Sequence, residues 1–119
     1  MTPERARDSL IKIAEDTAAL LDIDGWKDEV SLAQGCSAGV EFGYTYAAPP
    51  ADSVRLAEAR KVAEYWRPLG METRVNSEND PVVFGSGGPI QSISFSTGPG
   101  VYDVSGTSLC VPGDPDDYR

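Results

Sequence analysis

One stretch near the middle of the chain constrains the fold more than any other. From residue 40 to residue 46, apolar or aromatic side chains alternate with a glutamate, a glycine and a threonine. A period of two is typical of a β-strand that has one buried face and one face in water. The apolar set is Val40, Phe42, Tyr44 and Tyr46. The sequence therefore predicts a strand over these residues, with the aromatic set mainly forming the core face of a sheet.

The two cysteines bracket most of the chain that follows this strand. Cys36 stands just before the strand and Cys110 lies close to the C-terminus, so they could form a disulfide, remain buried thiols or belong to a metal site. A tetrahedral zinc site needs further ligands, and the chain has no histidine and no third cysteine. A disulfide would close a loop of roughly 75 residues and stabilise the fold by about 4 kcal/mol. We expect the disulfide, and with it an oxidising compartment.

The charge balance excludes some classes of partner. The chain has 119 residues, the size of one domain, with 10 basic and 19 acidic residues, a net charge of −9 and a pI near 4.3. Such a surface repels nucleic acid and anionic membrane surfaces. The excess of acid serves solubility alone, or it provides a face for a basic partner protein or a cation.

The start of the chain leaves two interpretations of its location. Thr2 and Pro3 follow Met1 at once, with no signal peptide, and no segment is apolar for long enough to span a bilayer. Read literally, this start indicates the cytoplasm. Because of the cysteines we expect instead a protein of the cell envelope, or a secreted one, from which an export signal before Thr2 has been removed.

Two amphipathic helices are predicted. The first starts at Thr2, which can cap it, with Pro3 in the first turn, and it ends near Gly25. Its apolar face is Ala6, Leu10, Ile13, Ala14, Thr17, Leu20 and Leu21. The second helix is capped by Asp52 or Ser53 and stopped by Pro68. Its apolar face is Val54, Leu56, Ala59, Val62, Ala63 and Trp66.

The remaining segments predict a sheet. Residues 25–34 indicate a loop or a short edge strand, because Lys27, Asp28 and Glu29 form a charge cluster. Further strands are predicted over 71–75, 81–84 and 90–97, with a last strand over 101–111 that is interrupted by a bulge. Short turns between strands predict antiparallel pairing. The expected fold is an α+β two-layer sandwich over residues 1–112, in which two helices pack on one face of a four- to five-stranded, mainly antiparallel sheet. Residues 113–119 are expected to form a loose acidic tail.

The strand patterns also predict which side chains face water. Ser92, Ser94 and Ser96, together with Glu41 and Thr45, are expected on the open face. Ile93 and Phe95, together with Phe42 and Tyr44, are expected to face the helices. One face of the sheet is therefore predicted to be rich in hydroxyl groups.

The residues that common catalytic mechanisms need are missing. Without histidine, neither a Ser-His-Asp nor a Cys-His arrangement can be built. The segment Gly85-Ser86-Gly87-Gly88 resembles a phosphate loop, but Pro89 leads it into a strand rather than into a helix. We interpret this segment as a hairpin turn, and we expect no catalytic residues and no cofactor.

Two groups of residues remain as weak binding candidates. Asp22, Asp24, Asp28 and Glu29 are closely spaced carboxylates that could meet around calcium, although the twelfth position of an EF-hand counted from Asp22 is Ala33 and not glutamate. The aromatic residues Trp26, Tyr44, Tyr46, Tyr65 and Trp66 could line a ligand pocket between sheet and helices, or could only be core. Trp66 is expected in the core, whereas Tyr65 and Tyr46 are the candidates for a binding contact.

Several short motifs resemble one family. They are Gly35-Cys36 before the aromatic strand, the helix end Tyr65-Trp66-Arg67-Pro68-Leu69-Gly70, and the closing Gly106-Thr107-Ser108-Leu109-Cys110. In layout the chain resembles small actinobacterial secreted lipoproteins of unknown function, the LppA-like group. The resemblance implies an export signal that ends in a lipid-modified cysteine. It implies no catalytic residues.

Together these features predict a non-enzymatic, extracytoplasmic binding domain, the soluble part of a cell-envelope lipoprotein. Its expected partner is another envelope component or a protein. It would touch the membrane only through the removed lipid anchor, and it would not bind nucleic acid. The alternative is an acidic inhibitor or immunity protein that binds a basic partner protein, whose association the net charge would accelerate. A small calcium-dependent module or hydrolase is the third hypothesis.

Overall fold

The computed structural model describes residues 1–21, 23–49, 55–98 and 100–119, and for residues 29–31 it describes the backbone alone. Two α-helices are present in this part of the chain, α1 (Pro3–Ala19) and α2 (Arg55–Trp66). The strands are β1 (Lys27–Cys36), β2 (Gly39–Ala48), β3 (Met71–Asn76), β4 (Val82–Gly87), β5 (Ile90–Ser96) and β6 (Tyr102–Ser108). Two short 3-10 helices follow α2 and close the chain, η1 (Arg67–Leu69) and η2 (Pro115–Tyr118).

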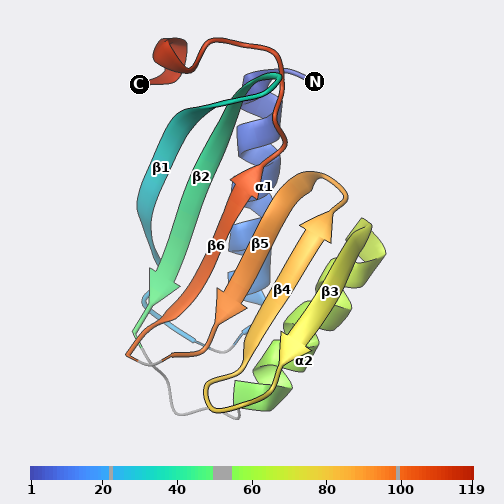
Figure 1. Ribbon diagram of the computed structural model, residues 1–119. Helices are drawn as coiled ribbons and strands as arrows, with labels where there is room; N and C mark the ends of the chain where they lie inside the picture. The colour runs from blue at the N-terminus through green and yellow to red at the C-terminus, as the bar shows by residue number, and fades with distance from the viewer. Residues whose placement is uncertain (22, 50–54, 99) are drawn as a thin grey trace.

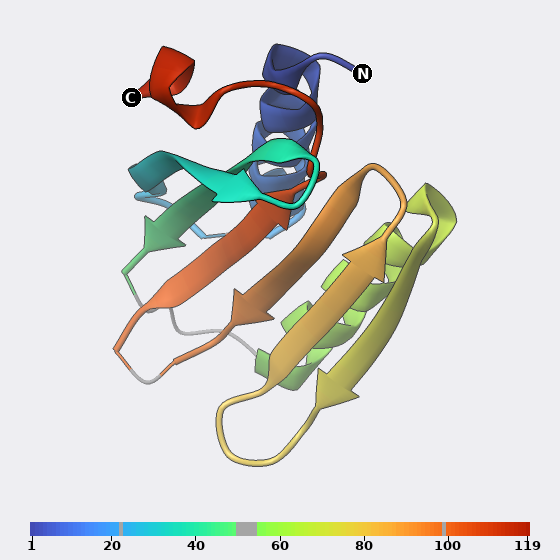
Figure 2. The same ribbon diagram turned by 45° about the horizontal axis from the view of Figure 1, so that its top comes forward.

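The strands form one sheet with the order β1-β2-β6-β5-β4-β3, in which all neighbours are antiparallel. Both helices cover the same face of this sheet, α1 behind β2, β6 and β5, and α2 behind β3 and β4 (Figure 1). In the turned view, no helix of the described residues covers the opposite face (Figure 2). The fold is therefore α+β, as predicted.

Helix α1 starts where the sequence predicts. The Thr2 hydroxyl accepts a hydrogen bond from the backbone N–H of Arg5 at 3.2 Å, and Pro3 occupies the first turn. The helix ends at Ala19, several residues before Gly25. Among the described residues, no helix combines the length and the apolar character needed to cross a membrane.

Helix α2 is described from Arg55 onward, so the predicted caps Asp52 and Ser53 lie outside the described residues. Its buried residues are Ala59, Val62, Ala63 and Trp66. After η1 the chain turns through Gly70, whose φ of +97° favours glycine, and then enters β3.

The core lies between the helices and the sheet, and the predicted inward side chains are there. Phe42, Tyr44, Ile93 and Phe95 are all buried. Two sheet glycines allow the helices to approach closely. A Cβ on Gly106 would lie 2.9 Å from a methyl group of Leu10 in α1, and a Cβ on Gly85 would lie 2.9 Å from the Trp66 ring of α2.

The strand number is higher than predicted, six instead of four to five. The main reason is β1, a ten-residue strand where a loop or short strand was expected. β1 is the edge strand next to β2, so Lys27 and Asp28 remain exposed to water while their backbone pairs with β2. A charge cluster therefore does not exclude a strand at an edge.

Two turn predictions are also corrected. Residues 85–87 belong to β4 and not to a turn, which is confined to residues 88 and 89. The last strand is continuous from Tyr102 to Ser108, and the irregularity expected in it lies in β5, between Ile90 and Ser92. Val111, expected at the end of the last strand, pairs with Val40 in an isolated bridge instead. Pro99, in the predicted turn before that strand, lies outside the described residues.

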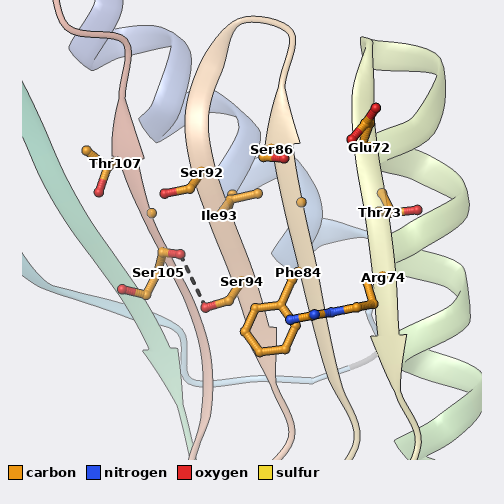
Figure 3. A pocket seen from close by; sticks show the side chains of 12 residues that line it. Glu72, Thr73, Arg74, Phe84, Ser86, Ser92, Ile93, Ser94, Ser105 and Thr107 are labelled. Atoms are coloured by element: carbon orange, nitrogen blue, oxygen red, sulfur yellow. Dashed lines mark hydrogen bonds between the residues drawn. The ribbon is translucent and has the colours of Figure 1, made fainter.

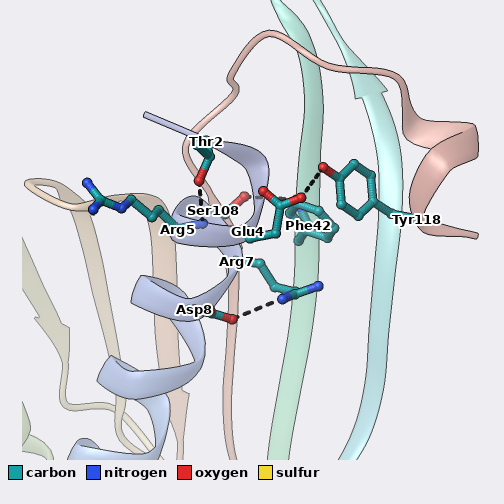
Figure 4. A network of polar contacts seen from close by, with 8 residues as sticks. All are labelled: Thr2, Glu4, Arg5, Arg7, Asp8, Phe42, Ser108 and Tyr118. Carbon is teal, nitrogen blue, oxygen red and sulfur yellow. Dashed lines mark hydrogen bonds and ion pairs between the residues drawn. The ribbon is translucent and has the colours of Figure 1, made fainter.

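The C-terminal residues, expected to be loose, are packed on the sheet. The Tyr118 ring of η2 meets Phe42 edge to face, with 5.3 Å between the ring centroids. The Tyr118 hydroxyl donates a hydrogen bond to Glu4 of α1 (Figure 4), and Arg119 donates one to the carbonyl of Ala33 at 3.3 Å. The prediction failed because the proline-rich, acidic composition of this segment does not reveal its contacts with distant residues. Tyr118 packs on Phe42, which lies 76 positions earlier in the chain.

The disulfide between Cys36 and Cys110 is confirmed, with an S–S distance of 1.96 Å. It joins the end of β1 to the segment after β6, across the start of β2. Two backbone hydrogen bonds between Val40 and Val111, of 2.8 and 3.0 Å, reinforce the same junction. A disulfide of this kind is consistent with an oxidising compartment.

Candidate functional site

The structure describes the side chains of only two of the four predicted calcium ligands, Asp24 and Asp28. Asp22 lies outside the described residues and the side chain of Glu29 is not described. Asp24 is exposed in the segment before β1, and Asp28 lines a cleft among aromatic rings. No group of three or more acidic or cysteine side chains within the described residues could hold a metal ion.

We call the face of the sheet that carries no helix of the described residues the outer face, and an open hollow lies on it. The antiparallel register places outward side chains of β2 to β6 in two rows across the sheet. The first row is Thr45, Ser105, Ser94, Phe84 and Arg74. The second row is Gly43, Thr107, Ser92, Ser86 and Glu72. Over β3 to β6 these rows line an open hollow of about 630 Å³ (Figure 3).

Hydroxyl groups dominate the middle of both rows. The Thr45 and Ser105 hydroxyls are 3.0 Å apart across β2 and β6, and the Ser94 hydroxyl donates a hydrogen bond to the carbonyl of Ser105 at 3.5 Å. Each hydroxyl can donate one hydrogen bond and accept others. The floor of the hollow is therefore polar without being charged, in a chain whose net charge is −9.

An aromatic ring and a cation stand together at the β3 and β4 side of the hollow. The Phe84 ring is 40% exposed, and the Arg74 guanidinium carbon lies 4.8 Å from its centroid. Figure 3 shows the guanidinium against the ring, next to Ser94. No ion pair to Arg74 is formed among the residues that the structure describes, so its donors face water and the hollow.

Sequence reasoning found part of this face and missed the rest. The prediction that Ser92, Ser94 and Ser96 turn away from the helices is confirmed, because Ile93 and Phe95 between them are buried. Phe84 was missed because Val82, Val83 and Phe84 form a continuous apolar run that does not show which residue points outward. Its pairing with Arg74 depends on the β3–β4 register, which no local pattern reveals.

A second concavity, which we call the aromatic cleft, lies beside α1 on the helix side of the sheet. Trp26 stacks on Tyr46 with 5.4 Å between ring centroids, and Tyr44 stacks on Tyr46 at 6.2 Å. The cleft has a volume of about 440 Å³, and its other lining residues are Ile11, Glu15, Lys27 and Asp28. The candidate Tyr46 is thus a half-buried member of this cleft.

The remaining candidate aromatics lie elsewhere. Trp66 is fully buried in the core, as predicted, and its indole N–H donates to the hydroxyl of Thr17 at 2.9 Å. Tyr65 is half-buried against the core, and its pKa is raised first by burial and then by the nearby carboxylate of Asp16. Part of the Tyr65 side chain is thus still exposed, and a binding contact through it stays a prediction.

Comparison with known proteins gives one structural neighbour. No protein-family model matches the sequence, and no curated protein matches it significantly. The chain is similar in structure to a DUF4853 family protein from Actinomyces odontolyticus, with a TM-score of 0.50 and 17% sequence identity. The likeness shows the fold alone. It covers 93% of this chain and 64% of that protein, so the chain spans less than two thirds of its neighbour. The neighbour supports only loosely the expected link to an actinobacterial group of unknown function, and it does not support the lipoprotein or LppA-like assignment.

Proposed function

We propose that this chain is a non-enzymatic, extracytoplasmic binding domain and that its outer face binds a carbohydrate component of the cell envelope. The observation that carries the proposal is the pair of hydroxyl rows, the first of which ends at the exposed Phe84 ring and the Arg74 guanidinium. Serine and threonine hydroxyls exchange hydrogen bonds with sugar hydroxyls in either direction. An exposed aromatic ring offers an apolar surface to the C–H face of a sugar.

The charge of the chain favours a neutral carbohydrate over an acidic one. An anionic polymer would be repelled by a net charge of −9 and by Glu72 at the end of the second row. Arg74 still provides donors to neutral hydroxyl or amide oxygens. The flat, open shape of the hollow suits an extended polymer segment rather than an enclosed small molecule.

Chemical-shift mapping tests this proposal. We would titrate the ¹⁵N-labelled domain with neutral oligosaccharides released from an actinobacterial cell wall. The account predicts shifts concentrated on the outward residues of β3 to β6, including Ser94, Phe84 and Arg74. Shifts confined to the helix side, or no shift at any ligand concentration, would contradict the proposal.

The location proposed for the domain rests on the disulfide. Cell fractionation of the source bacterium with a specific antibody tests it, because an extracytoplasmic protein should be absent from the cytosolic fraction. Lipid anchoring remains a prediction. An anchored protein would partition into the detergent phase, and a secreted one would appear in the medium.

A further inference from the structure

The aromatic cleft has no role in the proposed carbohydrate site, which lies on the opposite face of the sheet. We propose that this cleft binds an alkylammonium group, carried either by a free amine or by a lysine side chain of another protein. Two features of the cleft favour such a ligand, the stacked rings and the acidic side chains around them.

The rings provide the surface that such a cation prefers. The Trp26 and Tyr46 rings are stacked with an angle of 22° between their planes, and Tyr44 continues the stack at 20°. Aromatic faces attract cations, tryptophan most strongly, and clusters of such rings recognise quaternary ammonium groups. The rings line an open hollow rather than a filled core, since Trp26 and Tyr46 are only half-buried.

Two carboxylates approach the hollow from different elements. Glu15 projects from α1 and Asp28 from β1, and both line the cleft with the rings. The pKa of Tyr44 is raised to about 12, first by burial, next by Asp28 and then by Glu15. Both carboxylates are therefore close to Tyr44. They make the electrostatic potential in the cleft negative, which favours a positively charged ligand.

Lys27 is the positively charged side chain in the cleft, and it disfavours binding of a cation. It lines the same cleft and is exposed, and no ion pair of its ammonium is formed within the part of the chain that the structure describes. Its charge would repel a bound cation. Replacement of Lys27 by a neutral residue should therefore strengthen binding, whereas loss of either carboxylate should weaken it.

The indole N–H of Trp26 is a direct reporter of binding in the cleft. Its Nε1 is buried, and it has no hydrogen-bond partner among the residues that the structure describes, an uncommon state for a buried donor. The indole N–H of Trp66 is instead bonded to Thr17 deep in the core. The chain contains two tryptophans, so a ¹⁵N spectrum should show two indole signals, and Trp26→Phe assigns them.

The experiment follows these two signals during titration at low salt with choline, with N-acetyl-lysine methylamide and with 3,3-dimethylbutanol, a neutral analogue of choline. The account predicts that at least one of the two cations shifts the Trp26 signal and leaves the Trp66 signal in place. The cation that binds more tightly identifies the source of the ammonium group. The neutral alcohol should have little effect.

Three variants test the role of charge. Asp28→Asn and Glu15→Gln should each weaken binding by about two- to fivefold, the range expected for an exposed ionic contact. Lys27→Gln should strengthen it about twofold, by the same reasoning. Glu78→Gln, which removes an exposed charge in the β3–β4 turn, is the matched control and should leave the affinity unchanged.

The unchanged Trp66 signal verifies that each variant is folded. The proposal is wrong if neither cation moves the Trp26 signal, or if the neutral alcohol binds as well as choline. It is equally wrong if the Asp28 and Glu15 variants bind like the Glu78 control.

Discussion

The indole N–H of Trp66 donates a hydrogen bond to the hydroxyl of Thr17 over 2.9 Å, and that hydroxyl donates in turn to the carbonyl of Ile13 at 2.6 Å. Both Trp66 and Thr17 are completely buried. The bond joins α2 to α1 beneath the sheet, so a polar link holds the two helices of the core in one position.

Loss of the hydrogen bond between Trp66 and Thr17 should destabilise the fold. Thr17→Val keeps the shape of the side chain but removes the acceptor, so the Trp66 donor stays buried without a partner. We expect the free energy of unfolding to fall by about 1–3 kcal/mol. Urea denaturation measures the change. Thr17→Ser, which keeps the hydroxyl, should retain more stability, and equal losses for the two variants would contradict this account.

A methyl group at Gly106 should disturb the contact between α1 and the sheet. Its Cβ would lie 2.8 Å from the Ser92 carbonyl and 2.9 Å from Leu10, so backbone or helix must move. We expect Gly106→Ala to lower stability by about 1–3 kcal/mol. The thermal midpoint of unfolding should fall accordingly.

Gly43→Ala is the matched control for the change at Gly106. Gly43 also lies in a central strand, but a Cβ there would meet no atom within 4 Å, and its φ is not positive. The change should be neutral or slightly stabilising, because alanine restricts the unfolded chain. If the two variants lose equal stability, the close approach of Leu10 is not the cause.

The disulfide should contribute much of the stability. Replacing both Cys36 and Cys110 by serine frees a loop of 74 residues, for which chain entropy gives a loss of about 4 kcal/mol. Urea denaturation with and without reductant should show the same difference for the natural chain. If reductant does not change the midpoint of unfolding, the disulfide does not stabilise the fold. Mass spectrometry of the unreduced protein provides the control for disulfide formation.

The buried Tyr44 should make the fold sensitive to alkali. Burial and the carboxylates of Asp28 and Glu15 raise the pKa of Tyr44 from 10 to about 12 in the folded chain, while the unfolded chain ionises near 10. The unfolded state therefore gains stability between these values, by about 1.4 kcal/mol for each pH unit. Tyr44→Phe should lose less stability between pH 10 and 12. If both proteins have the same slope, Tyr44 does not titrate as described.

Local patterns predicted the elements that depend on their own residues. The Thr2 cap, the apolar faces of both helices and the inward side chains of β2 and β5 follow directly from capping and periodicity. Strand β1 could not be found this way, because an edge strand buries little and its ten residues are fixed by pairing with β2. The packing of Tyr118 on Phe42 is likewise a contact between distant parts of the chain.

The candidate site could likewise be predicted only where it depends on local patterns. The alternating serines of β5 indicated a polar face, but the two rows exist only because four other strands align their outward residues with it. The sequence indicates the cleft only in outline, as a set of aromatic residues. The pairing of β1 with β2 brings Trp26, just before β1, to Tyr44 and Tyr46, whereas Tyr65 lies elsewhere.

The dissociation constant of the Phe84→Ala variant for a neutral cell-wall oligosaccharide shows whether the outer face is the carbohydrate site. We predict that the dissociation constant rises about tenfold, because the variant loses the ring on which a sugar would stack. Val101→Ala is the control, since Val101 is 36% exposed in the turn before β6, outside the hollow. It should bind like the natural chain. If Phe84→Ala also binds like the natural chain, the outer face is not the carbohydrate site.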